Sequence, residues 1–338
     1  MRTRTPIALA AAAASALSLA APAYSAGNGS NHDYTLAVIG DVPYGAEQIQ
    51  KFPAWIDEIN ADPDVRYDVH LGDIKNGSTR CDTEYFQWVK GQFDRFRDPL
   101  VYTPGDNEWT DCHRANNGAY NPLERLQAVR DTFFTRPNLT NGRSQHVNTQ
   151  ASEGLPENAA FSRNGVEFAA VHVVGSNNDL APWTGLGKTA ATPEQTTEQA
   201  NRMTASISWV RQAFERAKGQ HGRAVVLMMQ ADMFDPTYDV PRANNSAFDP
   251  LVAEIASQTK AFGKPVYLLN GDSHIYDSDN PLAPGSKWLS FYGLKEGVNN
   301  FHRVTVDGSD NNKDWLKLTV TGASNATPLT WERVPYQH

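Results

Sequence analysis

Residues 101–110 read VYTPGDNEWT, an apolar run of strand length that leads directly into Gly105-Asp106. Three other apolar runs end in the same way: TLAVIGD at residues 35–41, DVHLGD at 68–73 and PVYLLNGD at 265–272. Roughly one or two Gly-Asp pairs are expected by chance in a chain of this composition, but their placement is more informative than their number. We expect each pair to lie at the end of a buried strand, where the glycine lets the backbone turn and approach a ligand.

The segments between these runs alternate between strand and helix patterns, which predicts an α/β domain built from βαβ units. Helices are predicted near residues 46–62 and at 83–96, 123–134, 204–219 and 249–263, and strands at the four Gly-Asp runs, at 165–178 and before Gln230. The polar stretches 137–160 and 179–200 are predicted to be loops. The C-terminal runs KWLSFYG, FHRVTVDG and DWLKLTVTG are predicted to finish a sheet in antiparallel fashion. No linker composition divides the chain, so residues 27–338 are predicted to be one domain.

The composition is that of a soluble globular protein, with 338 residues, 40% of them hydrophobic and 20% charged. The formal net charge is −8 and no long basic run is present, so a nucleic-acid partner is not expected. Residues 1–26 have a secretory signal pattern, with two arginines in MRTRT, an Ala-rich apolar run and the small-residue sequence APAYSA. The alternative is an N-terminal membrane anchor. We expect a secreted or periplasmic protein that is free of the membrane after cleavage.

The chain has two cysteines, which follow two of the Gly-Asp runs. Cys81 lies eight residues beyond Asp73, and Cys112 lies six residues beyond Asp106. If the two aspartates converge, the loops that follow them cover the same face, and a Cys81–Cys112 disulfide becomes plausible in an oxidising compartment. The alternative is a pair of buried free thiols.

Six side chains at or just beyond predicted strand ends are candidate metal ligands. They are Asp41, Asp73, Asp106, Gln230, Asp272 and His274. Ligands of open α/β sheets bind outside the carboxyl ends of the strands. Carboxylates gathered there repel one another unless cations neutralise them, so the sequence predicts divalent metal at this edge. A single strand-end aspartate is often only a turn former, and that alternative applies to each one taken alone.

The order of these motifs resembles that of the calcineurin-like metallophosphoesterase family over residues 34–276. The family motifs are Asp-x-His, Gly-Asp, Gly-Asn-His-Asp/Glu, a strand-end His, and Gly-His-x-His. The matching stretches here are Asp41-Val42-Pro43, Gly72-Asp73, Gly105-Asp106-Asn107-Glu108, Met229-Gln230 and Gly271-Asp272-Ser273-His274. The resemblance implies a four-layer α/β/β/α sandwich with mixed sheets.

The resemblance also implies roles for the candidate residues. Asp73 would bridge two divalent ions, and Asp41 and His274 would ligate one of them. Asp106, Gln230 and Asp272 would stand where the other ion takes its ligands. Water activated by the ions would attack phosphorus, as in two-metal hydrolases.

The sequence departs from the family pattern at several ligand positions. Pro43, Gln230 and Asp272 stand where the family has three histidines, so most of the remaining ligand atoms are oxygens. Such a site favours Mg²⁺ or Mn²⁺, also suits Ca²⁺, and suits Zn²⁺ or iron less well. Asn107 replaces the histidine that assists the leaving group, and an amide is not a general acid at neutral pH. His113 is expected to supply that group from the following loop, and Arg114 to clamp a phosphate.

These observations predict an exported metal-dependent phosphoesterase acting on a small phosphomonoester or phosphodiester. The alternative is a catalytically degenerate member of the same fold that binds metal or a phosphorylated ligand without turnover. His70 and His172 are predicted to belong to the core, although the segment after His172 also points to the site. For Tyr44 and Trp109, pocket lining and core packing both remain open, and the sequence does not indicate an oligomeric state.

Overall fold

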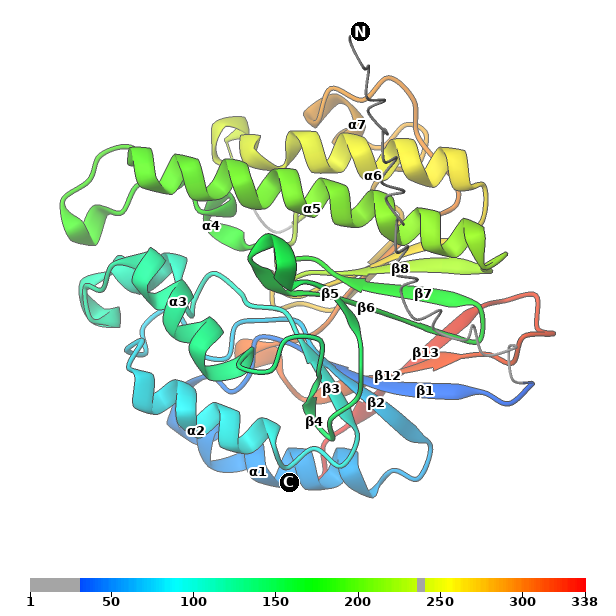
Figure 1. The fold of residues 1–338 in the computed structure, drawn as a ribbon, viewed down its shortest axis with the longest axis horizontal. Helices are drawn as coiled ribbons and strands as arrows, with labels where there is room; N and C mark the ends of the chain where they lie inside the picture. Colours follow the sequence, from blue (N-terminus) through cyan, green and yellow to red (C-terminus); the bar gives the residue numbers. More distant parts are fainter. Residues whose placement is uncertain (1–30, 236–240) are drawn as a thin grey trace, which may run out of the picture.

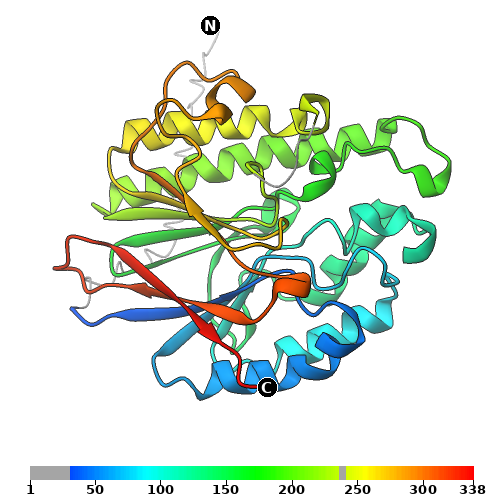
Figure 2. The same cartoon turned by 180° about the vertical axis from the view of Figure 1, so that it is seen from behind.

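The computed structural model describes residues 31–235 and 241–338, and the predicted signal peptide lies outside these ranges. Within the described residues the strands form two mixed sheets, of six and seven strands. The sheets pack face to face, and helices cover the outer face of each, as Figures 1 and 2 show. The predicted α/β/β/α sandwich is therefore confirmed.

The first sheet has the order β13-β12-β1-β2-β3-β4. Its strands are β1 (Tyr34–Ile39), β2 (Val65–His70), β3 (Pro99–Tyr102), β4 (Asn141–Gly142), β12 (Asp314–Val320) and β13 (Leu329–Pro335). The central strands β1, β2 and β3 are parallel, and β12 pairs antiparallel with β1. Because parallel strands end at the same edge, the residues after β1, β2 and β3 come together there.

The second sheet has the order β10-β11-β9-β8-β7-β6-β5. Its strands are β5 (Asn148–Gln150), β6 (Leu155–Arg163), β7 (Val166–Ala170), β8 (Ala224–Met228), β9 (Val266–Asn270), β10 (Asp277–Asp279) and β11 (Phe301–Thr305). Strands β7, β8, β9 and β11 are parallel, whereas β5, β6 and β10 add antiparallel edges. The ends of β8 and β9 carry the remaining candidate ligands.

Helices α1, α2 and α3 cover the first sheet and α5 and α6 cover the second, while the short α7 lies beyond α6 (Figure 1). Their bounds are α1 (Gly45–Ala61), α2 (Thr83–Phe93), α3 (Pro122–Phe133), α5 (Pro193–Gly219), α6 (Asp249–Phe262) and α7 (Lys287–Phe291), and the short α4 spans Gly175–Asn178. The 3-10 helices are η1 (Thr110–His113), η2 (Ala115–Asn117), η3 (Ala151–Glu153), η4 (Thr184–Leu186), η5 (Arg242–Asn244), η6 (Ser246–Phe248) and η7 (Ser309–Asn311). No helix of the described ranges has the length and apolar character that a membrane crossing requires.

Three apolar layers hold the sandwich together. The layer between the sheets includes Leu36, Val69, Phe168 and Leu269, all essentially inaccessible to solvent. Separate layers lie under α1 and α2 and under α5 and α6. Apolar strands buried on both faces give near-continuous hydrophobic runs, which is why the strand signal in the sequence is strong.

The structure contains the predicted disulfide between Cys81 and Cys112, with a Cα–Cα distance of 5.8 Å. It joins the segment before α2 to η1. Both sulfur atoms lie close to the carbonyl oxygen of Asn107, at 3.5 Å for Cys81 and 3.7 Å for Cys112. The disulfide therefore braces the loop that carries Asn107, and the free-thiol alternative is wrong.

Several predicted element boundaries are wrong. The predicted loop 137–160 contains β4 and β5 and the start of β6, and α5 begins at Pro193 inside the predicted loop 179–200. Thr192 is the N-cap of α5 and forms a capping box with Gln195. The capping box starts the helix at this point, although the polar composition of the segment had suggested a loop. The run KWLSFYG was predicted to be a strand but contains helix α7, which Ser286 caps. Its apolar residues Trp288 and Tyr292 pack together in the core that also contains the buried residues of α6, so they lie on one side of a helix and do not alternate between the two faces of a strand.

The C-terminal part of the sheets differs in a second way. Strand β12 pairs antiparallel with β1 and β13, whereas β11 runs parallel to β9 and is antiparallel only to the edge strand β10. Strand β13 lies outside the predicted strands because its residues are largely exposed at the edge of the first sheet, which removes the apolar alternation. The predicted strand 165–178 ends at Ala170, and the chain then turns into the site.

The two histidines expected in the core are both fully buried. His70 Nε2 lies 2.9 Å from the carbonyl oxygen of Val42, and burial lowers the pKa of His70 to about 4. His172 Nδ1 lies 2.9 Å from Glu157, and Arg130 makes a further ion pair with Glu157 at 2.6 Å. Burial also lowers the pKa of His172, although its contact with Glu157 works in the opposite direction.

Glu157 should make stability depend on pH in the acid range. Burial raises its pKa, but the contacts with His172 and Arg130 outweigh burial and hold it at about 2. A depressed carboxyl pKa stabilises the folded state above the unfolded pKa near 4.3, and that stabilisation is lost as pH falls toward 2. We expect Glu157→Gln to cost about 2–3 kcal/mol at pH 7 and progressively less from about pH 4.5 downward. Urea unfolding of both proteins across this range measures the difference, and a difference independent of pH would contradict the assignment.

Candidate metal centre

Two sheets deliver the candidate ligands to one edge of the sandwich. Asp41, Asp73 and Asp106 follow β1, β2 and β3 of the first sheet. Gln230 follows β8 and the Asp272–His274 segment follows β9 of the second sheet. The backbone ties neighbouring strand ends together at this point, since Asp41 N–H donates to Gly72 O and Gly271 N–H donates to Gln230 O. The predicted convergence of strand ends is what the structure shows.

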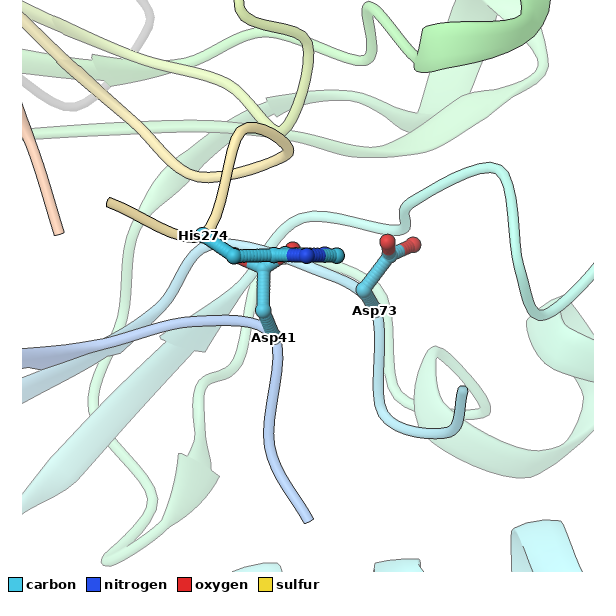
Figure 3. Close-up of side chains that lie close together, drawn as sticks. All are labelled: Asp41, Asp73 and His274. Carbon is cyan, nitrogen blue, oxygen red and sulfur yellow. The ribbon is translucent and has the colours of Figure 1, made fainter. Parts of the chain in front are cut away.

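Asp41, Asp73 and His274 form the first cluster, drawn in Figure 3. One ligand atom from each residue lies within 4.8 Å of the others. His274 Nε2 is 3.3 Å from Asp41 Oδ1, and the His274 side chain remains 34% exposed while Asp41 is completely buried. Two buried carboxylates and a half-open imidazole are a donor set that suits a divalent cation approached from solvent.

Asp73, Asp106 and Asp272 form the second cluster, again with carboxylate oxygens within 4.8 Å of one another. Asp73 thus belongs to both clusters, which is the central position that the family resemblance implies for it. Burial and then the charges of Asp106 and Glu108 raise the pKa of Asp73 well above its usual range. Burial and then the charge of Asp106 do the same to the pKa of Asp272. A cation among these groups would remove the repulsion.

Glycines supply the space in which the carboxylates sit. A Cβ on Gly105 would lie 2.1 Å from Asp73 Oδ1, and a Cβ on Gly271 would lie 2.1 Å from Asp41 Oδ2. Gly105 therefore makes room for Asp73, not for its neighbour Asp106, and Gly271 makes room for Asp41, not for its neighbour Asp272. At Gly105 and Gly271 the glycine is therefore a packing requirement of the convergent strand ends.

Four of the cluster residues have left-handed backbone conformations. The φ angles are 55° for Asp41, 57° for Asp73, 73° for Asp272 and 62° for His274. Aspartate tolerates this region better than most residues, but each non-glycine instance still costs free energy. Surrounding contacts hold these turns, as expected where the backbone aims side chains into a site.

Gln230 lies at the centre of the second cluster with its amide nitrogen facing the carboxylates. Its Nε2 donates to Asp73, Asp106 and Asp272 at 3.3, 3.1 and 3.0 Å. Its Oε1 accepts the backbone N–H of Gly175 at 2.7 Å. Turning the amide around would set its NH₂ against that N–H, so the Gly175 donor dictates this orientation. Gln230 as a metal ligand stays a prediction that requires the opposite orientation.

Asn107 and Tyr44 both donate to Asp73. Asn107 Nδ2 lies 2.8 Å from Asp73 Oδ2 and the Tyr44 hydroxyl lies 2.9 Å from the same oxygen. Asn107 Nδ2 also donates to the Tyr44 oxygen at 2.8 Å. Tyr44 therefore belongs to the site, a question the sequence left open. Trp109 instead is fully buried, with the guanidinium of Arg202 over its ring, so it packs in the core.

Arg114 reaches the rim of the site beside Asn107. Its Nη2 forms an ion pair with Asp111 at 2.6 Å, and its side chain is 43% exposed. The side chains of Arg114 and Asn107 both approach Gly77. A Cβ atom added to Gly77 would lie 3.0 Å from Arg114 Nη1 and 3.2 Å from Asn107 Oδ1, so the two groups are close to each other. A half-exposed guanidinium at this place suits a phosphate arriving from solvent.

His113 is buried and engaged with another loop. Its Nδ1 accepts the N–H of Gly185 in η4 at 3.2 Å. Burial and the neighbouring Arg114 charge lower the pKa of His113 to about 4, so the imidazole is neutral at pH 7. His113 lies outside both carboxylate clusters, and its role as proton donor stays a prediction that these contacts do not favour.

Several residues with roles at the site were missed or given no role from the sequence. Glu108 Oε1 accepts from Asp73 N–H, Gly105 N–H and the Tyr102 hydroxyl, at 3.1, 2.6 and 2.8 Å, and so joins two ligand loops. Lys75 is completely buried, and its Nζ donates to Asn107 O at 2.6 Å. The sequence did contain a signal for this role, because Lys75 follows the strand-end Asp73 by two residues. A buried group of carboxylates is stabilised by a nearby cation.

The turn after Val174 was missed for a different reason. The α4 residues Ser176 and Asn177 have φ of 51° and 54°, so this element is a left-handed turn and not a helix. It brings Ser176 Oγ to 3.0 Å from Asp106 Oδ2 and 2.8 Å from Asp111 Oδ1. Composition predicts a turn at GSNN, but its handedness and its contact with the aspartates depend on the tertiary fold.

The profile of calcineurin-like phosphoesterases matches residues 34–276, which include both clusters. The chain belongs to that family. Among solved structures, a similar fold occurs in GAP50, described as the anchor in the inner membrane complex of Plasmodium, at 10% identity and a TM-score of 0.45, covering 91% of this chain and 90% of that one. A 5′-nucleotidase precursor from Thermus thermophilus gives 12% identity and a TM-score of 0.43, covering 90% of this chain but 54% of the nucleotidase. No curated protein matches the sequence.

Proposed function

We propose that this protein is an exported phosphoesterase that uses a divalent cation to hydrolyse a phosphate ester. The observation that carries the proposal is the Asp41, Asp73 and His274 cluster, which lies within the family-matched region beside Asn107 and Arg114. The signal pattern of residues 1–26 and the Cys81–Cys112 disulfide support export, because disulfides persist in oxidising compartments.

The donor set of the first cluster fits a divalent ion, and Asp41, Asp73 and His274 would hold it. When bound, the ion would supply Lewis-acid polarisation of a phosphoryl oxygen and activation of water. Mg²⁺, Mn²⁺ or Ca²⁺ fits this oxygen-rich set better than Zn²⁺.

We propose one ion per chain in place of the two expected from the sequence. In the second cluster the Gln230 amide nitrogen already donates to all three carboxylates, so a hydrogen-bond donor stands where a second cation would. A cation and this amide nitrogen cannot share the position, because both are electropositive.

The remaining residues position the ester. Arg114 would bind non-bridging phosphoryl oxygens in a bidentate manner, and Asp111 holds its guanidinium in place. Asn107 can donate a hydrogen bond but cannot give up a proton at neutral pH. The alcohol must therefore leave as its own anion or take a proton from water, which favours esters of acidic alcohols such as phenols.

Metal removal tests the proposal. After dialysis against a chelator we expect no hydrolysis of 4-nitrophenyl phosphate, and activity should return with Mg²⁺ or Mn²⁺. Alkyl phosphates should react slower by at least about 100-fold, because the Asn107 amide beside Asp73 cannot protonate the leaving group. Absence of hydrolysis with every cation, together with stabilisation by cation binding, would favour the second candidate, a binding protein without turnover. The Asn107 amide and the Gln230 amide are the features that favour that candidate.

A further inference from the structure

The loop after β9 that carries Asp272 and His274 is held by a residue with no role so far. We call residues 271–274 the ligand loop. Asp272 and His274 have left-handed φ angles of 73° and 62°, and Ser273 lies between them. Such a backbone keeps its shape where surrounding contacts enforce it, so the contacts of this loop decide where its side chains point.

Asp232, in the segment that follows β8, makes two contacts with the ligand loop. Its Oδ2 accepts the Ser273 hydroxyl at 2.8 Å, and its backbone N–H donates to Asp272 Oδ2 at 3.1 Å. One residue therefore holds both the middle of the loop and the carboxylate that precedes it. Because Ser273 is joined directly to His274, the hydroxyl contact also fixes the backbone from which the imidazole extends.

Asp232 is itself fixed from its other side. Its Oδ1 accepts from Arg303 Nη1 at 2.8 Å and from the backbone N–H of Phe234 at 2.9 Å. The Arg303 side chain is fully buried and that of Asp232 is 1% exposed, so water does not compete for these contacts. Arg303 also pairs with Asp277 and Asp279 at 2.6 and 2.9 Å, which ties it to β10.

The segment that carries Asp232 is anchored in the core. Phe234 is buried and packs edge-on against Trp288 and Tyr292, and the Tyr292 hydroxyl donates to the carbonyl oxygen of Met233. The ligand loop, in contrast, is half-exposed. Asp232 thus joins a well-packed segment to a loop that has little packing of its own.

Both oxygens of Asp272 are engaged in this arrangement. Oδ2 accepts from Asp232 N–H, and Oδ1 accepts from Gln230 Nε2 at 3.0 Å. With Asp272 held in this way, His274 is the residue of the ligand loop that contributes to the first cluster.

We propose that Asp232, fixed by Arg303, is a positioning residue that acts through the Ser273 hydroxyl to hold His274 in place as a metal ligand. Asp232 belongs to neither carboxylate cluster and acts only through its neighbours. Groups that orient a metal ligand in this way typically contribute about 10–100-fold to metal affinity. The inference rests on the proposed function, since that function makes His274 a ligand.

Removing the Ser273 hydroxyl tests the proposal without touching a buried ion pair. The dissociation constant for Mn²⁺, measured from the electron paramagnetic resonance signal of the free ion, should rise at least about 10-fold in Ser273→Ala. Ser273→Thr keeps the hydroxyl and should bind Mn²⁺ as the parent does. Ser208→Ala, at a half-buried serine of α5 that bonds to Gln212, is the matched control and should leave the constant unchanged.

The unfolding temperature separates positioning from a purely structural role. Metal-free Ser273→Ala should unfold within a few degrees of metal-free Ser208→Ala, because each loses one hydrogen bond of a half-buried hydroxyl. A much lower unfolding temperature in Ser273→Ala would assign the contact to stability and overturn the proposal. An unchanged dissociation constant in Ser273→Ala, or an equal rise in Ser273→Thr, would also overturn it.

A double variant tests whether Asp232 acts through Ser273. Asp232→Ala should also weaken Mn²⁺ binding, and Arg303 keeps its pairs with Asp277 and Asp279 in that variant. Because both substitutions remove the same contact, the double variant should bind Mn²⁺ no more weakly than the weaker of the two single variants. Additive losses would contradict the route through Ser273.

A parent protein that binds no Mn²⁺ would end the proposed function and give a different result here. Hydrogen–deuterium exchange of the backbone amides of residues 271–276 then measures the loop directly. Faster exchange in Ser273→Ala, but not in Ser273→Thr or Ser208→Ala, would support the positioning of the loop by Asp232 even without an ion. Equal exchange in all four proteins would overturn it.

Discussion

Replacing Asp73 with asparagine is expected to remove the bound divalent ion and to lower kcat/KM for 4-nitrophenyl phosphate by about 10²–10³-fold or more. Asp73 is the residue that both clusters share, and it is nearly inaccessible to solvent. The substitution removes one of two carboxylates from the first cluster and leaves only one acidic ligand beside His274. Because asparagine has almost the same shape, the fold should persist.

The metal-free protein should respond in the opposite direction. Burial, followed by the charges of Asp106 and Glu108, disfavours the charged form of Asp73. Removing that charge relieves repulsion, so the apo form of Asp73→Asn should unfold at the same temperature as the apo parent or higher. Mass spectrometry under native conditions counts the ions, and calorimetry measures the unfolding temperature. Asp131→Asn is the surface control. An unchanged ion content and rate in Asp73→Asn would end the proposed mechanism.

The second large effect is expected at Gln230. Gln230→Glu exchanges the amide nitrogen for oxygen with almost no change in shape, and the other carboxylate oxygen can still accept the Gly175 N–H. The second cluster would then contain four carboxylates, and no amide donor would stand at the point where they meet. We expect the ion content to rise from one to two per chain in Mn²⁺, because hard cations prefer such an oxygen set.

Stability provides an independent measure of the same change. Without metal, Gln230→Glu should be less stable than the parent, since it adds a buried like charge at the point where three carboxylates meet. Added Mn²⁺ should restore its stability more than that of the parent, by the mass-action effect of a second bound ion. Gln127→Glu on the exposed side of α3 is the control. Two ions in the parent protein would contradict the proposal of a single ion and favour an inverted Gln230 amide.

Much of this protein follows from local sequence. Apolar runs that end on Gly-Asp predicted strands at β1, β2, β3 and β9, and the sheet rule then predicted that Asp41, Asp73, Asp106 and Asp272 converge. The same reasoning predicted the Cys81–Cys112 pair. These inferences succeed because buried parallel strands have a strong periodic signal and because all parallel strands end at one edge.

Tertiary structure alone decided how the converged side chains face one another. The orientation of the Gln230 amide depends on the N–H of Gly175, which is 55 residues away in the chain, and the role of Tyr44 depends on its contact with Asp73. The left-handed turn at Ser176 likewise depends on distant loops, since the next residue, Asn177, bonds to the backbone of Ala243 and Ala247. Hydrophobic periodicity reports which face of an element is buried, whereas hydrogen-bond direction and cavity shape are set by partners that only the folded chain brings together.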